Sequence, residues 1–202
     1  MFITPEEIAR LERSMGPTKE FSVRFEMKGE EMDLVESSMH DGRAHDVTVF
    51  PFYKGKVVTI EKHDYPPAIS RAPSGGVKKG ESIIKGAKRE ALEETGLEVE
   101  LEWYITRFNA EFICGEKRIP WTSHVFIGEV KGEVVESELA PLDTVEIRKV
   151  NLVDIDELLG PIAENMRASD IGGFHYRAEL TEKTLELWKE RGGWCRIGSS
   201  DF

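Results

Sequence analysis

The chain has 202 residues, a length that suits one domain of moderate size with an appended segment. Its 38 acidic residues outnumber 27 basic ones, for a formal net charge of −11, which argues against nucleic acids and anionic membranes as partners. No apolar run approaches the roughly 20 residues that cross a bilayer. The two cysteines, Cys114 and Cys195, lie far apart, and we see no secretory signal. We therefore expect a reduced, cytoplasmic protein.

The first 45 residues predict an N-terminal extension made of a helix and a strand. Thr4-Pro5-Glu6-Glu7 is typical of a helix start, and Ile8, Leu11 and Met15 would form the apolar side of that helix. Apolar and polar residues alternate over 21–27, which predicts a strand. Residues 28–42 show no pattern that we can assign. We place the domain boundary after residue 45.

Residues 46–202 predict a second, larger unit in which strands and helices alternate. Residues 46–53 and 56–61 read as a hairpin around Lys54-Gly55. Further strands are predicted over 98–109, 111–114, 122–130 and 144–153, with a loop over 131–143. Asp154 would cap a helix whose apolar face carries Ile155, Leu158, Leu159 and Ile162, and a last helix spans 181–191. This order predicts an α/β fold, with a mixed sheet flanked by helices.

The most informative stretch is 75–97, GGVKKGESIIKGAKREALEETGL. Glu90, Glu93 and Glu94 are spaced so that on a helix they share one face. Adjacent carboxylates repel each other, and folding does not require them there, whereas a hard divalent cation such as Mg²⁺ or Mn²⁺ prefers oxygen ligands. Ser82 can cap the start of such a helix, and Gly96 can end it. The stretch therefore predicts a metal-binding helix.

Residues around the three glutamates support this interpretation. Gly75 leaves a bare backbone that can approach a metal or a phosphate, and Gly86 would leave room for a ligand. Arg89 precedes Glu93 by one turn and can hold that carboxylate in place. We expect neither Glu93 nor Glu94 to have a buried partner.

The pattern G-x5-E-x7-R-E-U-x-E-E-x-G-U, with U aliphatic, resembles the signature of the Nudix hydrolases. The matching residues are Gly75, Glu81, Arg89, Glu90, Glu93, Glu94, Gly96 and Leu97, with Ala91 in the first aliphatic position. The order of elements extends the resemblance over roughly residues 43–162. It implies an α/β/α Nudix sandwich with a mixed sheet, an N-terminal extension and a C-terminal helix. It also implies metal-dependent hydrolysis of a small nucleotide diphosphate.

The resemblance also implies roles for individual residues. Glu90, Glu93, Glu94 and a backbone carbonyl near Gly75 would hold Mg²⁺ or Mn²⁺. Arg89 would orient Glu93, and Glu81 would support the helix start or a second metal. A water proton would pass to Glu93 or to an acid of the following loop, which carries Glu136, Glu138 and Asp143. Of these three we choose Glu138, although a solvated acidic loop explains them equally well.

The lead-in Tyr65-Pro66-Pro67 resembles that of the ADP-ribose pyrophosphatases, although Arg71 stands where that branch commonly has a glutamate. The resemblance implies that Tyr65 and Arg71 bind substrate and that the N-terminal extension builds a homodimer. The substrate would be a nucleoside diphosphate linked to another moiety. Tyr65, Phe108 and Trp121 are candidates to stack on a nucleobase, with core packing as the alternative.

Two other functions stay open. The substrate could be a (deoxy)nucleoside triphosphate, with the planar fork of Arg71 gripping its terminal phosphate. The chain could also be a Nudix-fold sensor that binds a nucleotide without cleaving it, although a sensor has no need for the complete acidic set. His63, His124 and His175 lack metal-ligand spacing, so we interpret them as structural.

Overall fold

A seven-stranded mixed sheet forms the centre of the computed structural model, which describes residues 3–39 and 42–193. The strand order is β1-β5-β6-β2-β3-β7, and the short β4 pairs with β2. β1 runs parallel to β5 and β2 parallel to β6, whereas the other pairs are antiparallel. The strands are β1 Lys19–Glu26, β2 His45–Tyr53, β3 Lys56–Lys62, β4 Ser74–Gly75, β5 Val99–Cys114, β6 Lys117–Val130 and β7 Ile147–Val153. The expected mixed sheet is confirmed.

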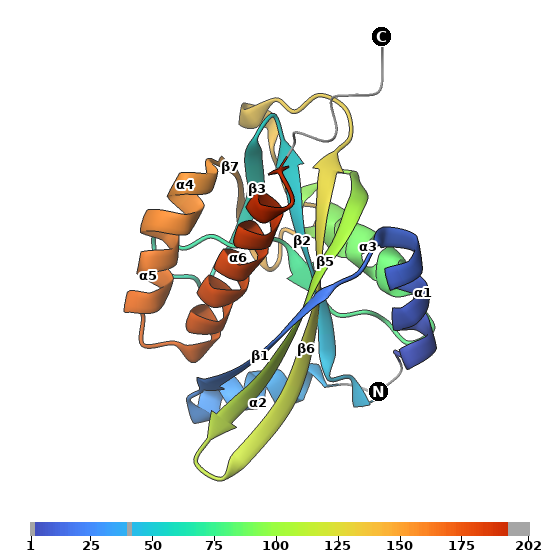
Figure 1. Cartoon of the computed structure of the whole chain (residues 1–202). Coiled ribbons are helices and arrows are strands. Elements are labelled where there is room, and N and C mark those ends of the chain that lie inside the picture. The colour runs from blue at the N-terminus through green and yellow to red at the C-terminus, as the bar shows by residue number, and fades with distance from the viewer. Residues whose placement is uncertain (1–2, 40–41, 194–202) are drawn as a thin grey trace.

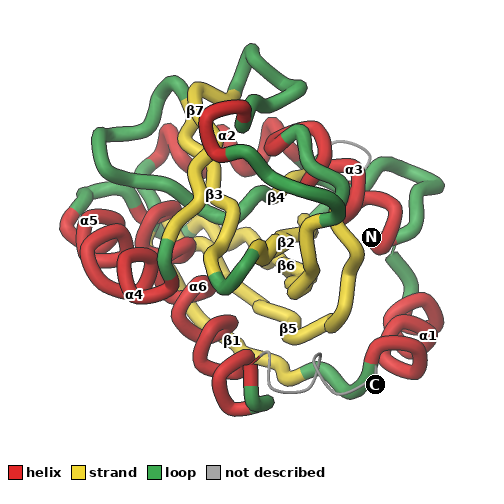
Figure 2. The backbone as a smooth tube through the Cα atoms, turned by 90° about the horizontal axis from the view of Figure 1, so that it is seen from above, coloured by secondary structure: helices red, strands yellow, loops and turns green. Residues whose placement is uncertain are grey.

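Helices cover both faces of this sheet (Figures 1 and 2). One face carries α1 Pro5–Met15 and α3 Ile83–Thr95; the other carries α2 Gly29–Ser38, α4 Ile155–Glu157, a π-helix Leu158–Ile162, α5 Ala163–Ala168 and α6 Gly172–Glu190. In β2, Val47 and Val49 belong to the core under α3, whereas Phe50 and Phe52 belong to the core under α6. A strand covered on both faces is apolar almost throughout. The α/β/α sandwich is therefore confirmed.

α3, the helix of the 75–97 stretch, begins and ends where the sequence predicts. The hydroxyl of Ser82 accepts a hydrogen bond from the Lys85 N–H at 3.3 Å, and Gly96 ends the helix with φ of 73°. α1 contributes to the start of the helix, because the carboxylate of Glu7 accepts the N–H of Ile83 at 3.1 Å. A capped and buried helix start fixes the direction in which the later glutamates project.

The N-terminal extension is part of the sheet. β1 pairs with β5 over its whole length, from Lys19 opposite Thr106 to Glu26 opposite Ile113. Residues 28–42, which showed no pattern, contain α2, whose one buried residue is Met32. A single buried position gives no periodic signal, which explains why the sequence did not reveal this helix. The domain boundary at residue 45 and the homodimer stay predictions.

Several element boundaries differ from expectation. β5 is one continuous strand in place of the two predicted over 98–114, and β6 begins at Lys117, five residues before the predicted 122. β7 begins at Ile147, three residues after the predicted 144. The two long strands form a hairpin whose polar tip gives no apolar alternation.

The C-terminal helices also differ from the prediction. α6 begins at Gly172, nine residues before the predicted 181, and Phe174, Tyr176 and Ala178 are buried in its first half. The carboxylate of Asp154 makes no capping bond; it pairs with Lys56 Nζ at 3.5 Å. Cys114 is a free thiol, and Cys195 lies outside the described residues. No helix within 3–39 and 42–193 is long and apolar enough to span a membrane.

A buried histidine pair lies in the sheet. His124 is 2% exposed, its Nδ1 is 2.7 Å from the Tyr104 hydroxyl, and its ring lies 6.0 Å from that of His45. Burial, with the neighbouring His45 and Arg107, lowers the pKa of His124 to about 3. His124 therefore binds a proton more readily in the unfolded chain than in the folded one. The free energy of unfolding is at its full value above the ordinary pKa of 6.5 and falls as the pH drops below it.

We expect His124→Gln to reduce this loss of stability. Between pH 7 and pH 5 the wild type should lose about 2 kcal/mol of unfolding free energy through His124, and the variant should not, because glutamine does not titrate. Urea denaturation at both pH values measures the difference. His63→Gln, at an exposed position, controls for the removal of one histidine. An equal loss in His124→Gln and wild type would contradict this expectation.

Candidate active site

Two glycines, the last residue of β4 and the residue after it, lie where charged side chains meet the backbone. A Cβ on Gly75 would lie 2.1 Å from Glu90 Oε2, and one on Gly76 would lie 1.2 Å from Arg43 Nη1. No other residue fits at either position without displacing these groups. The backbone at the glycine pair Gly75-Gly76 thus contacts an acid from α3 and a base from the N-terminal extension.

Arg89 organises three of the four carboxylates of residues 75–97, the segment that we call the box. Its guanidinium binds Glu81 through two bonds of 2.9 Å and donates to Glu90 at 2.6 Å and to Glu93 at 2.9 Å. It also donates to the carbonyl of Gly76 at 2.7 Å. The expected contact between Arg89 and Glu93 is therefore present. The predicted ligand space at Gly86 is wrong, because Val77 and Glu81 lie 3.1 and 3.2 Å from where its Cβ would be.

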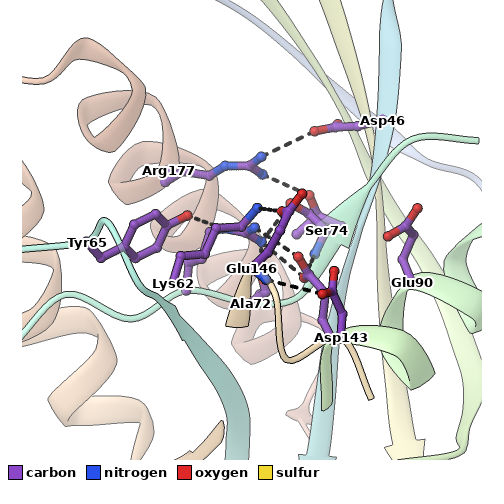
Figure 3. A network of polar contacts seen from close by, with 12 residues as sticks. Asp46, Lys62, Tyr65, Ala72, Ser74, Glu90, Asp143, Glu146 and Arg177 are labelled. Carbon is purple, nitrogen blue, oxygen red and sulfur yellow. Dashed lines mark hydrogen bonds and ion pairs between the residues drawn. The ribbon is translucent and has the colours of Figure 1, made fainter. Parts of the chain in front are cut away.

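Arg71 holds the fourth carboxylate, that of Glu94, in a buried ion pair. The two side chains are 5% and 7% exposed, and Nη2 lies 3.2 Å from Glu94 Oε1. The other donors of Arg71 bind the Tyr65 hydroxyl at 2.6 Å and the Ser74 hydroxyl at 2.8 Å (Figure 3). The N–H of Ser74 donates to Glu94 at 2.7 Å. The expectation that Glu94 lacks a buried partner is wrong.

The four glutamates carry more negative charge than the side chains that bind them neutralise. Two guanidiniums, Arg71 and Arg89, face the four carboxylates, and the exposed Lys78 adds a third cation, with its Nζ 4.0 Å from Glu93. Burial raises the pKa of Glu90, and the neighbouring charges of Glu94 and Glu93 raise it further. A divalent cation would balance this excess, and carboxylate oxygens beside a bare backbone are the donors that Mg²⁺ and Mn²⁺ prefer. The donor set therefore fits the metal, although no three acidic, histidine or cysteine side chains converge on one point in the described chain.

A cleft of about 740 Å³ opens beside the glycine pair, at one end of the sheet. The strand order places its lining residues in sequence across the sheet: Phe112 on β5, Trp121 on β6, Asp46 on β2 and Lys62 on β3, with Glu146 next to β7. At this end residues 71–75 lie between β2 and β3, because the N–H of Val49 donates to Pro73 and the N–H of Ile60 donates to Arg71, so the cleft spans the sheet from β5 to β7. β4 pairs with β2, which places the glycine pair in the middle of this span.

A family model described as NUDIX domain matches residues 42–171. The chain belongs to this family and is a Nudix hydrolase. Among solved structures, a Nudix hydrolase from Nitrosomonas europaea is 22% identical, with a TM-score of 0.51 over 73% of this chain and 89% of that one. A UDP-X diphosphatase is 17% identical, with a TM-score of 0.51 over 83% and 72%. These likenesses support the fold, and no protein of curated function matches the sequence.

The predicted site residues of this Nudix hydrolase are distributed as follows. Gly75, Arg71 and Tyr65 line the cleft. The guanidinium of Arg71 binds protein groups, and the ring of Tyr65 packs against Phe174 at 5.0 Å, so their predicted contact with substrate stays untested. Phe108 is fully buried and cannot stack on a nucleobase.

The acidic loop after β6 contributes to the cleft through a different residue from the one predicted. Glu138 is exposed in a single 3-10 turn and is not among the residues that line the cleft. Asp143 shapes the turn, since its carboxylate accepts the N–H groups of Val145 and Glu146. Glu146 lines the cleft and pairs with Lys62.

Several charged residues of the cleft were missed by the sequence analysis. Arg177 of α6 lies 3.3 Å from the carboxylate of Asp46 and donates to the Thr48 hydroxyl at 3.2 Å (Figure 3). Arg43 and Lys62 add two more cations. The one available signal was Asp46, a charge near the start of an otherwise apolar strand. Arg43, Lys62 and Arg177 are brought to the cleft by the strand order and by the position of α6, which the sequence pattern does not contain.

The buried pair yields a stability prediction. Glu94→Gln should lower the free energy of unfolding by about 3–5 kcal/mol, because it leaves the guanidinium of Arg71 buried without a counter-charge. Adding Arg71→Gln should recover part of this loss, so that a double-mutant cycle by urea denaturation gives a large coupling energy. Glu93→Gln, whose side chain is 44% exposed, is the matched control with little effect. A Glu94→Gln variant as stable as wild type would disprove the ion pair.

Proposed function

We propose that this Nudix hydrolase cleaves a nucleoside diphosphate linked to another moiety, of the ADP-ribose or nucleotide-sugar type, into two phosphate esters. The observation that carries the proposal is the position of the glycine pair in the middle of the cleft. A diphosphate bound there has room for a group on each side. A triphosphate would need room for a large group on one side only.

The residues proposed to hold Mg²⁺ or Mn²⁺ are Glu90, Glu93, Glu94 and the backbone carbonyl of Gly75. Glu90 lies against Gly75, and Arg71 fixes Glu94 at the same end of α3. When bound, the metal supplies charge neutralisation of the diphosphate and activation of a water molecule.

Proton transfer is assigned to Glu93. Its side chain is 44% exposed, against 14% for Glu90 and 7% for Glu94, so it is the box acid most accessible to water. Arg89 holds one of its oxygens and orients the carboxylate. Neither Glu93 nor Glu138 is among the residues that line the cleft. Glu93 is preferred because Arg89 holds it beside Glu90, whereas Glu138 lies in an exposed 3-10 turn.

Three cations that line the cleft would bind the diphosphate, two of them by giving up or sharing their present partners, Asp46 for Arg177 and Glu146 for Lys62. Arg43 lies directly against Gly76, Arg177 lies across from it on α6, and Lys62 lies toward the β3 side. Fixed positive groups aimed at phosphate oxygens stabilise the charge that develops as the anhydride breaks. One diphosphate would therefore meet the metal-binding carboxylates beside the glycine pair and the cations that line the cleft.

The assignment of Glu93 predicts a large kinetic defect without a folding defect. Glu93→Gln should lower kcat by about 100-fold or more, because glutamine cannot accept the proton. Glu138→Gln should stay near wild type. A chelator should abolish turnover in all forms, and added Mg²⁺ or Mn²⁺ should restore it in wild type. Steady-state kinetics with circular dichroism as a folding check measures this, and full activity in metal-stripped protein would refute the mechanism.

The substrate class is tested by the products. ADP-ribose and nucleotide sugars should yield a nucleoside monophosphate and a sugar phosphate, at a higher kcat/KM than any nucleoside triphosphate. UDP-sugars belong in the panel because one protein of similar fold is a UDP-X diphosphatase. Chromatography of the products separates the outcomes. Faster release of pyrophosphate from a triphosphate would establish a nucleoside triphosphate pyrophosphatase instead. Nucleotide binding without turnover would establish a sensor.

A further inference from the structure

The two ends of the cleft differ in chemistry. The end at β5 and β6 is lined by apolar and aromatic side chains, namely Met27, Leu34, Val35, Phe112 and Trp121. The end at β3 and β7 carries Lys62, His63, Asp64 and Glu146, with Val145 beside them. Because the glycine pair lies between these ends, the two groups on a bound diphosphate meet different surroundings.

The apolar end presents a leucine that folding does not require. Leu34 on α2 is 70% exposed, whereas Met32 two residues earlier is 1% exposed and anchors the helix. α2 is also fixed to α6, because the carboxylate of Glu31 accepts the N–H groups of Gly172 and Gly173 at 3.2 and 2.8 Å. An exposed leucine on a fixed helix beside a cleft is available to contact a ligand.

Arg43 connects the apolar end to the glycine pair. Its Nε donates to the carbonyl of Ser38, at the end of α2, at 2.8 Å. Its guanidinium carbon lies 5.8 Å from the ring centroid of Trp121, and its Nη1 lies against Gly76. One residue thus contacts the helix, the aromatic wall and the backbone at which the diphosphate is placed. A group attached to that diphosphate on this side enters the apolar end.

The lining of the apolar end suits a flat ring. The planar guanidinium of Arg43 lies over the ring of Trp121 and offers a stacking surface that any nucleobase can use, while Trp121 and Phe112, which are 8% and 3% exposed, support it from below. Polar groups that could read the edge of a base are few: the indole N–H of Trp121 and the hydroxyl of Ser38, which already donates to the Val35 carbonyl at 2.7 Å. The presence of a base should therefore affect kcat/KM more than the identity of the base.

We propose that α2 and the β5–β6 hairpin form a nucleobase subsite, and that the polar end takes the second moiety of the substrate. The proposal rests on the proposed function and adds the orientation of the substrate, with the base at the apolar end and the second moiety at the polar end. The hairpin lies within the matched range 42–171, whereas α2 precedes it, so the α2 side of the subsite lies outside the part of the chain that matches the family model.

The experiment compares ADP-ribose with an analogue in which a hydroxyl replaces the adenine. For wild type, kcat/KM for ADP-ribose should exceed that for the analogue by about tenfold or more, the value of one stacked base. Leu34→Glu should lower this ratio about tenfold and Leu34→Ala less, whereas replacing adenine by uracil should matter less than removing it. Val135→Glu is the matched control, since Val135 is also an exposed apolar residue but does not line the cleft.

Each outcome decides one of the two proposals. Equal hydrolysis of both compounds by wild type, or an unchanged ratio in Leu34→Glu, overturns the subsite and leaves the proposed hydrolysis standing. Hydrolysis by wild type of neither compound, and of none of the nucleotide sugars in the panel, overturns the proposed function. Calorimetry then still tests the subsite: AMP should bind more tightly than ribose 5-phosphate, and Leu34→Glu should remove the difference. Equal binding of the two monophosphates overturns it.

Discussion

The site depends on two arginines that divide four carboxylates between them. Without Arg71 and Arg89, the glutamates of α3 and the preceding loop would repel one another. Arg89 gathers Glu81, Glu90 and Glu93 at the more exposed edge, whereas Arg71 holds Glu94 in the interior. A guanidinium suits this task because it stays charged and bonds several acceptors in one plane. The remaining negative charge is what a divalent cation can balance.

The strand order converts this local cluster into a site for a larger ligand. β4 pairs with β2 near the middle of the sheet, so the glycine pair lies between the aromatic residues of β5 and β6 and the polar residues of β3. α6 then brings Arg177 over Asp46 on β2. Each segment supplies one or two side chains, and only the assembled sheet places them around one cleft.

Local features were predictable and distant partners were not. The spacing of Glu90, Glu93 and Glu94, with Ser82 and Gly96 at the ends, predicted α3 because these signals all lie within the helix or at its ends. Arg71 gave no sign of its pairing with Glu94, 23 residues away, since strand pairing creates that contact. The single buried residue of α2 left no periodic signal. Its length and place follow from contacts with α6 that a linear pattern does not contain.

Chemistry and selection therefore reside in different segments. The carboxylates, their arginines and the glycine pair lie within residues 71–94, in α3, β4 and the segments beside them, where a change of charge at Arg71 or Glu94 disturbs buried bonds and the fold with them. α2 contributes mainly exposed side chains, and Glu31 and Met32 fix it independently of α3. Exposed positions tolerate substitution with little change in stability. The outer face of α2 can therefore vary with the group carried by the diphosphate, while the helix that performs the hydrolysis stays unchanged.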